Sequence, residues 1–429
     1  MELILDLHSH SGYSGGVGKI DMYKLSDSMK IKGIDIYGTG DILHPLWSSY
    51  LRLNLIEESD GIFKLKKDIN KSFFILQSEF IASYPYTKNS KKSFHLLILF
   101  PSFDSVLSIT KLFEKWGVKN TIGRPFLVCS SKKELIQRLF SIKEVNSYIE
   151  IIPAHIMTPE GVLGSKSPVY YIEEVFDEFK KNIYAIETGL SADPFMLEAI
   201  PELSNLSFIS NSDSHSVSPL RIGREFTCIK VEKLSYKNII DSIRNNNILY
   251  TGEFNPMEGR YFLTGHRGTR SKHNGKSLFF NTFKRPKKCS ICNKEFQMGV
   301  IERTIDIALH QGMKEFDYTP KRNYISIIPL IEIISIAINK KTDSKEVLNI
   351  YRSLIEIFGN EINLFSDKKH SIKIIENINI DDKVKKCLID VLEKKFTYDP
   401  PGFDGEYGKP VIGQKIELKD FIRSFLDRP

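Results

Sequence analysis

The feature that most constrains the fold is a regular alternation of short apolar runs and amphipathic stretches from Met1 to about Gly252. Short apolar runs are typical of buried strands, and longer amphipathic stretches are typical of helices. This order predicts a mostly parallel sheet covered by helices, either open or closed into a barrel. The predicted strands are Leu3–Leu5, Ile34–Tyr37, Phe73–Ile81, Leu96–Phe100, Tyr148–Ile152, Tyr184–Ile186, Ser207–Ile209 and Phe226–Val231. The predicted helices are Asp21–Lys30, Phe103–Lys115, Ser131–Phe140, Tyr170–Lys180 and Lys237–Asn245.

The pattern changes abruptly after Gly252, and a chain of 429 residues is long enough for two or three domains. The stretch from Arg260 to Lys288 holds nine Lys or Arg residues and no Asp or Glu. From Ile301 onward the apolar residues recur at helical spacing. We therefore predict a domain over residues 1–252, a basic insert over 253–300 and a helical domain over 301–429. The helices predicted there are Ile301–Gln311, Pro329–Ile338, Ser344–Phe358, Ile372–Asn377, Asp381–Lys395 and Leu418–Leu426.

Composition argues against a membrane or secreted protein. No apolar run approaches the roughly 20 residues that a membrane span needs, and the first residues lack the charged and apolar regions of a signal peptide. The five cysteines are too scattered for a disulfide framework. We expect a cytoplasmic monomer without membrane contact, and binding to a sliding clamp stays open.

Six of the ten histidines stand beside predicted strand ends, together with several carboxylates. Positions two apart in a strand face the same way, so His8 and His10 can bind one metal ion, with Asp6 behind them. The carboxyl ends of the strands converge in an α/β fold, which predicts one site for two or three divalent ions such as Zn, Mn, Fe or Mg. Glu187 is either a further site residue or the cap of a turn. The candidate metal ligands are His8, His10, Asp41, His44, Glu79, His95, His155, Asp213 and His215.

The motifs DLHSHSGYS, GTGDILHP, PAH and NSDSH, together with Glu79 and His95, resemble the polymerase and histidinol phosphatase (PHP) family of metal-dependent phosphoesterases over about Met1 to Tyr250. The resemblance implies a distorted (β/α)7 barrel of α/β class with a catalytic centre of His8, His10, Asp41, Glu79 and Asp213. It implies three ligand groups: His8, His10, Glu79 and Asp213; Glu79, His95 and His155; and Asp41 or His44 with His215. Tyr13 and Ser14 stand where some members carry a further histidine, which leaves the third position open.

The basic insert contains a C-x-x-C pair, Cys289 and Cys292, with His266 and His273 upstream. Together they offer four nitrogen and sulfur ligands, the number that a structural zinc ion requires. A polar loop gains little from hydrophobic burial, so a bound metal is a reasonable source of order. A redox pair, with the histidines simply part of the cationic loop, is the alternative.

The uniformly positive charge of the insert favours a polyanionic partner. The alternative is that these cations simply form a solvated surface. Aromatic residues between the cations either pack locally or stack on bases. The aromatic residues are Tyr261, Phe262, Phe279, Phe280 and Phe283. The predicted DNA-binding residues are Arg267, Arg270, Lys284, Arg285, Lys287 and Lys288.

The order of these parts, with the segments PAHIMTPEGVLGSKS, LIEIFGNEINLF and PPGFDGEYGKP, resembles the endonuclease Q family over nearly the whole chain. This resemblance implies DNA nicking on the 5′ side of deaminated bases (uracil, hypoxanthine, xanthine) and of abasic sites. Members tend to carry more cysteines upstream in the insert, where this chain has His266 and His273. A damaged base must leave the helix to be read, and Gly164 with Ser165 is a candidate wall for its pocket. Arg221 and Arg224 are candidates for holding the phosphate.

Two other functions are compatible with parts of the sequence. A small-molecule phosphatase would use the same barrel, but it would need neither the basic insert nor the helical region. A nucleic-acid-binding module with a non-catalytic metal site is the second alternative. The nearly complete ligand set argues against it.

Overall fold

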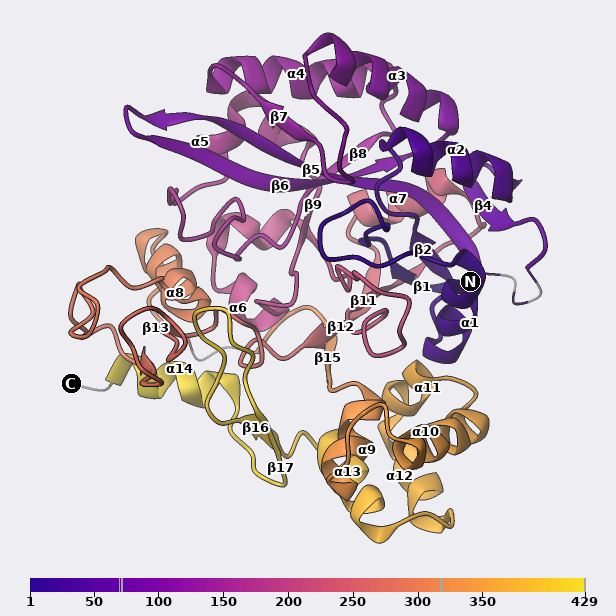
Figure 1. Cartoon of the computed structure of the whole chain (residues 1–429), viewed down its shortest axis with the longest axis vertical. Coiled ribbons are helices and arrows are strands. Elements are labelled where there is room, and N and C mark those ends of the chain that lie inside the picture. Colours follow the sequence, from indigo (N-terminus) through magenta and orange to yellow (C-terminus); the bar gives the residue numbers. More distant parts are fainter. Residues whose placement is uncertain (69, 71, 317–318, 428–429) are drawn as a thin grey trace. The chain divides into compact units, whose positions relative to one another are not determined.

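The computed structural model describes residues 1–68, 70, 72–316 and 319–427, which form two compact units (Figure 1). The first unit comprises Met1–Ile156, Glu160–Gly189 and Asn205–Gly252. The second comprises Met157–Pro159, Leu190–Ser204 and Glu253–Pro429, so the predicted insert and the predicted helical region share one unit. None of the helices in the described part of the chain has the length and apolar character that a membrane crossing requires.

The first unit is built around a mixed sheet with the strand order β12-β11-β1-β2-β5-β4-β3. Strands β6 and β7 branch from β5, and β8 pairs with β6. Strands β9 and β10 form a separate parallel pair. Strand β9 lies beside β8, and a bridge between Ser9 and Ser214 links the chain after β10 to the chain after β1, which gives a distorted barrel. The strands are β1 (Glu2–Asp6), β2 (Ile36–Gly38), β3 (Leu55–Ser59), β4 (Ile62–Leu65), β5 (Phe73–Thr87), β6 (Ser90–Phe100), β7 (Phe126–Val128), β8 (Glu150–Pro153), β9 (Ala185–Glu187), β10 (Ser207–Ile209), β11 (Phe226–Lys230) and β12 (Ile248–Phe254).

The prediction of a mostly parallel sheet is wrong, because parallel and antiparallel pairs are mixed throughout the sheet. Strand pairs β1–β2, β2–β5 and β5–β7 are parallel, but β5–β6, β6–β8 and β1–β11 are antiparallel. Only Lys88 and Asn89 separate β5 from β6, and so short a connection can only reverse the chain into a hairpin. This hairpin is the longest pairing in the unit and is visible in purple in Figure 1.

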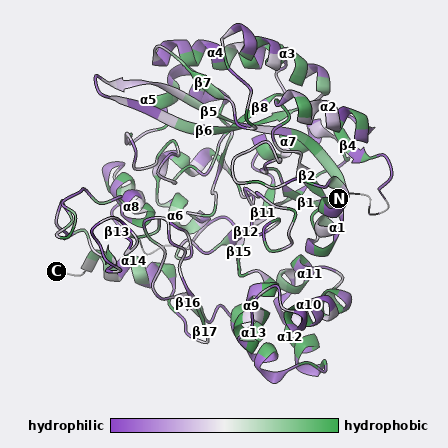
Figure 2. Ribbon diagram, in the orientation of Figure 1, coloured by the Kyte–Doolittle hydropathy of each residue, from purple (hydrophilic) through white to green (hydrophobic). Residues whose placement is uncertain are grey.

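The predicted helices lie at or near their predicted positions, and α1 (Met22–Lys32) carries a capping residue at each end. Asp21 accepts hydrogen bonds from the first turn of α1, and Gly33 closes that helix in the left-handed conformation. Helices α3 (Phe103–Lys115) and α4 (Lys132–Val145) pack beside each other over β5 and β6, and their mixed colours in Figure 2 reflect one apolar and one polar face. The other helices of this unit are α2 (Pro45–Asn54), α5 (Glu173–Phe176), the 3-10 helix η1 (Asp177–Asn182) and α7 (Tyr236–Arg244).

The core of the first unit is made by the inward side chains of the central strands. Leu5, Ile36, Ile75, Leu97 and Ile152 are all fully buried in one cluster. Each such side chain contributes about 1.5–3 kcal/mol of transfer free energy, so the core holds the strand ends rigidly. A rigid frame is what a multi-residue site needs.

The second unit carries the predicted C-terminal helices. The apolar helix α9 packs against α10 and α13. Glu361 at the start of α11 ties the group together, because its carboxylate accepts hydrogen bonds from the Leu330 amide (3.0 Å) and the Tyr351 hydroxyl (2.8 Å). The elements of this unit are α6 (Pro194–Glu198), β13 (Thr264–His266), β14 (Leu278–Phe280), α8 (Val300–His310), β15 (Tyr324–Ile327), α9 (Leu330–Ile338), α10 (Lys345–Phe358), α11 (Glu361–Ser366), α12 (Lys368–Asn377), α13 (Asp382–Leu392), β16 (Phe396–Tyr398), β17 (Pro410–Ile412) and α14 (Leu418–Asp427).

Candidate functional site

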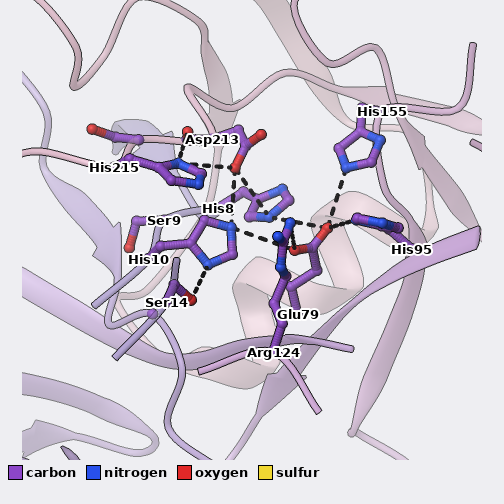
Figure 3. A network of polar contacts seen from close by, with 12 residues as sticks. His8, Ser9, His10, Ser14, Glu79, His95, Arg124, His155, Asp213 and His215 are labelled. Carbon is purple, nitrogen blue, oxygen red and sulfur yellow. Dashed lines mark hydrogen bonds and ion pairs between the residues drawn. The ribbon is translucent and has the colours of Figure 1, made fainter. Parts of the chain in front are cut away.

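Two short segments bring four site residues together beyond the ends of β1 and β10. Ser9 and Ser214 form a parallel bridge, and the His10 amide donates to the Ser214 carbonyl at 2.9 Å. Residues that flank a bridge pair face the side opposite to it, so His8 and His10 lie on the same side as Asp213 and His215. The H-x-H segment and the D-x-H segment lie side by side and therefore place their four side chains in one cluster (Figure 3).

The β5–β6 hairpin supplies the next two residues through its register. His95 stands opposite Ile81, two residues beyond Glu79, so His95 and Glu79 share one face of the hairpin. His155 follows β8, and its backbone has a φ of 31°. Asp41 (φ 41°) and Asp213 (φ 46°) also adopt the left-handed conformation, which is uncommon outside glycine. Such outliers concentrate where the surrounding structure over-determines a functional side chain.

The first ligand group consists of His8, His10 and Asp213. Asp213 Oδ1 lies 3.1 Å from His10 Nε2 and 3.7 Å from His8 Nε2. These three atoms are buried, and beyond the close contacts within the cluster none has a hydrogen-bond partner among the described residues. Buried polar atoms without partners are costly unless something else binds them. Two imidazole nitrogens and a carboxylate oxygen that converge in this way fit a divalent metal ion.

The second ligand group consists of Glu79, His95 and His155. Glu79 Oε1 lies 2.5 Å from His95 Nδ1 and 3.2 Å from His155 Nε2. The same carboxylate reaches the first group, because Glu79 Oε2 is 3.4 Å from His10 Nε2. Glu79 thus stands between the two groups, as Figure 3 shows. A shared carboxylate is the arrangement that two-metal sites use to hold both ions.

The electrostatics of the cluster favour bound cations. Burial lowers the pKa of both His8 and His10, but neighbouring carboxylates outweigh burial and raise these values to about 9 and about 10. Glu187 and Asp213 raise the pKa of His8, and Asp213 and Asp41 raise the pKa of His10. A cation competes with the imidazole proton for the same nitrogen, so the excess negative charge that holds the proton also favours a metal ion.

Carboxylates orient the two histidines of the first group from behind. His8 Nδ1 lies 2.9 Å from Glu187 Oε1, and His10 Nδ1 lies 3.1 Å from Asp41 Oδ1. These contacts leave both Nε2 atoms to face the centre of the cluster, as in many metal sites. The role predicted for Asp6 is wrong, because its carboxylate accepts the amides of Ser212 and Gly223 at 2.9 Å instead. Burial raises the pKa of Asp6 to about 6.

The residues predicted for a third metal position do not form a ligand group within the described part of the chain. The Asp41 carboxylate is occupied by His10 and by the hydroxyls of Ser11 (2.6 Å) and Ser14 (2.9 Å). The His44 ring stacks on Tyr13 with centroids 4.0 Å apart. The His215 ring lies 4.5 Å from the His10 ring, and its Nδ1 is 3.0 Å from the Asp213 carbonyl. Asp41 therefore orients a ligand, and His215 lies at the rim of the first group.

Replacing Glu187 with glutamine tests whether the Glu187 carboxylate orients His8 for metal binding. We expect metal affinity or turnover to fall by about 10- to 100-fold, because the ligand His8 loses its charged partner. Competition with a chelating dye would measure the affinity. Glu178, an exposed glutamate of η1, offers the matched Glu178→Gln control. Unchanged metal affinity and unchanged turnover would mean that Glu187 does not orient His8. Its role would then be structural, through its hydrogen bonds with the His155 amide and Asn211.

The remaining predicted pocket residues differ in their burial and in their contacts. Gly164 is buried and its amide donates to the Gly161 carbonyl, whereas Ser165 is half-buried. Arg224 is buried and donates to the Ser212 carbonyl at 3.3 Å, while Arg221 is exposed. Sequence reasoning missed Arg124, whose guanidinium lies 3.2 Å from Glu79, because no motif marks it.

The four predicted zinc ligands of the insert form a single group. Cys289 Sγ lies 3.5 Å from His273 Nε2, and Cys292 Sγ lies 3.5 Å from His266 Nδ1. The four ligand atoms are all within 4.8 Å of one another. Each histidine donates its other N–H to a backbone carbonyl, which directs the free nitrogen toward the cysteines. A backbone hydrogen bond at Lys294 lowers the pKa of Cys292, which favours the thiolate that binds metals.

Carboxylates compensate some of the predicted DNA-binding cations. Arg270 forms an ion pair with Asp404, which also accepts the Arg267 amide at 2.7 Å. Arg285 pairs with Glu302 at 2.8 Å. The exposed cations of the predicted set are Lys284, Lys287 and Lys288.

The aromatic residues of the insert pack locally. Phe262, Phe279, Phe280 and Phe283 contact other phenylalanines in the same unit, with ring centroids 4.9–5.4 Å apart. Phe283, for example, lies edge-on to Phe425 of α14 at 5.0 Å. Local packing is therefore the role that the contacts support for these rings.

Comparison with protein families and curated proteins gives three matches. A family model described as the MJ0043 C-terminal domain matches residues 329–391. The uncharacterized protein MJ0043 of Methanocaldococcus jannaschii is 33% identical over 252 residues, which cover 57% of this chain and 30% of that protein. The chain thus spans less than a third of MJ0043. The uncharacterized protein YqxK of Bacillus subtilis is 25% identical over 355 residues, with 77% of this chain and 82% of YqxK covered.

Two solved structures match the chain from end to end. The crystal structure of the lesion-specific endonuclease PfuEndoQ from Pyrococcus furiosus matches with a TM-score of 0.78 and 27% identity and covers 98% of both chains. A crystal structure of endonuclease Q with a 27-mer duplex that carries an abasic lesion at the active site matches with a TM-score of 0.79 and 25% identity, over 100% of this chain and 99% of that chain. These matches confirm the predicted resemblance to endonuclease Q and the predicted α/β fold with a helical C-terminal region.

Proposed function

We propose that this chain, which shares the endonuclease Q fold over its whole length, is a DNA repair endonuclease that cleaves 5′ to deaminated bases and abasic sites. The observation that carries the proposal is the pair of ligand groups joined by Glu79 in a fold that one neighbour uses on lesion-bearing duplex DNA. His8, His10 and Asp213 would hold one divalent ion, and Glu79, His95 and His155 a second. Bound Zn, Mn or Mg would supply Lewis acidity and an activated water at the phosphodiester.

The chain's own residues account for the rest of the proposed chemistry. Glu187 and Asp41 hold His8 and His10 in the orientation that turns their Nε2 atoms toward the centre of the cluster. Burial of the cluster keeps bulk water away, which strengthens each electrostatic contact with a reacting phosphate. The cysteines and histidines of the insert would hold a separate structural zinc ion.

Nicking of end-labelled duplexes that each carry one uracil, one hypoxanthine or one abasic site tests the proposal. We expect cleavage on the 5′ side of the lesion with Mg, Mn or Zn added, and none of an intact duplex. The variant Asp213→Asn should not nick but should still shift the duplex in a gel, since DNA affinity rests mainly on phosphate contacts elsewhere. Hydrolysis of a chromogenic phosphate ester without nicking would instead indicate a small-molecule phosphatase. Absence of any metal-dependent turnover would indicate a binding module.

The exposed lysines of the insert should carry part of the salt-dependent DNA affinity. Changing Lys284, Lys287 and Lys288 together to alanine should weaken binding to damaged and intact duplex alike. The slope of log affinity against log salt should become shallower by about 0.9 for each phosphate that the lysines no longer neutralise. The matched control removes three exposed lysines of α12, Lys368, Lys369 and Lys373. Equal slopes for the two triple variants would mean that the insert lysines face solvent in the complex.

A further inference from the structure

We propose that Arg124 binds the scissile phosphate directly, an inference that rests on the proposed phosphodiesterase function. Arg124 precedes β7, and its Nη1 lies 3.2 Å from Glu79 Oε2, the oxygen that also faces His10. Figure 3 shows the guanidinium beside Glu79, between the two ligand groups. The side chain is 30% exposed, whereas that of Glu79 is fully buried. Arg124 is therefore partly open to solvent while its guanidinium contacts the carboxylate shared by the two ligand groups.

The backbone on both sides of Arg124 is held by the segments that carry the metal ligands. The Gly123 amide donates to the Tyr13 carbonyl at 2.8 Å. A Cβ atom on Gly123 would lie 2.4 Å from both Asp41 Oδ2 and Ser14 Oγ, so a larger residue here would displace these two side chains. On the other side, the Pro125 carbonyl accepts the amide of Ile81, two residues beyond Glu79. Arg124 is thus placed by the same elements that place His10 and Glu79, which is the preorganisation that a reacting group needs.

The guanidinium has donors to spare for a ligand. An arginine side chain offers about five N–H donors in a planar fork. Among the residues that the structure describes, Arg124 forms one hydrogen bond, to Glu79. Its positive charge is that of any arginine side chain in a protein, which does not lose its proton. A charged fork with unused donors beside two cation sites matches the geometry of a phosphate with two non-bridging oxygens.

The other arginines near the site are less suited to this contact. Arg224 is buried, and its Nε donates to the Ser212 carbonyl, so it supports the loop that carries Asp213. Arg221 is exposed, and its amide closes a turn by donating to the Ser218 carbonyl at 2.8 Å. Contact with a non-bridging oxygen should strengthen as charge develops on the phosphoryl group, so Arg124 would act on turnover more than on duplex affinity.

The test compares the wild type with Arg124→Ala and Arg124→Lys in the metal-loaded protein. For Arg124→Ala we expect kcat on an abasic-site duplex to fall by about 10²- to 10³-fold, as for removal of one electrostatic contact in an active site. Duplex affinity should fall far less, because many other phosphate contacts remain. Arg124→Lys should recover part of the activity, since it keeps the charge but not the fork. Arg352→Ala, an exposed arginine of α10, is the control.

A second measurement does not depend on turnover. Titration calorimetry with inorganic phosphate should show binding to the metal-loaded wild type that is about tenfold weaker in Arg124→Ala, as expected when one charge-assisted hydrogen bond is removed. The metal content of both variants should equal that of the wild type. Unchanged kcat and unchanged phosphate affinity would overturn the assignment. A loss of metal from both variants would also overturn it and would make Arg124 a counter-ion of Glu79. If the wild type binds phosphate through Arg124 but nicks no duplex, the proposed function fails while the phosphate contact stands.

Discussion

The variant Glu79→Gln is expected to lose nicking by more than about 10³-fold, beyond the effect of removing one electrostatic contact from an active site. The reason is that Glu79 serves both ligand groups: one oxygen faces His95 and His155, and the other faces His10. A neutral amide weakens both sites at once. Elemental analysis should find up to about two fewer divalent ions per chain, one for each group. Initial rates on an abasic-site duplex would measure the loss of activity.

The control for this variant is Glu178→Gln, which removes one negative charge from the exposed surface of the same unit. The control should keep its metal and its rate. Glu79→Gln should retain its circular dichroism and its gel shift with DNA, which separates loss of the site from loss of the fold. Full metal content in Glu79→Gln would show that Glu79 is not shared between two ions.

The double variant Cys289→Ser, Cys292→Ser is expected to lose about one zinc ion per chain, the number a structural site holds. Zinc binding in small domains is worth about 10 kcal/mol or more, so the insert should lose its order without the ion. We expect a lower thermal midpoint for the second unit and weaker binding to DNA. Any remaining nicking should keep its dependence on added metal, because the barrel ligands are unchanged. Elemental analysis, differential scanning calorimetry and gel shifts give the three readings.

Cys387→Ser is the matched control, because Cys387 is a half-buried free cysteine of α13 outside the ligand group. It should keep the zinc content of the wild type. If the double variant also keeps it, the cysteines are not zinc ligands, and the assignments of His266 and His273 fail with them.

The element pattern of the first unit was largely predictable because local periodicity decides it. Helix α3 begins and ends at the predicted residues, and each predicted strand overlaps an observed one. Strands β3, β4, β7 and β12 and helix α2 were missed. Strand direction was also missed, because pairing depends on connection length and on contacts distant in sequence.

The sequence by itself determined which residues could bind metal ions. The motifs H-x-H, D-x-H and C-x-x-C and a single glutamate supply suitable ligands, and their spacing places the side chains of each motif on one side of the backbone. The tertiary structure alone decided which groups stand behind those ligands. Glu187 orients His8 across 179 positions of chain, Asp41 supports His10, and Arg124 meets Glu79 from 45 positions away. No local pattern encodes these contacts, because a hydrogen bond between distant segments depends on how the barrel strands are packed, and the same residue types are common elsewhere as caps and surface charges.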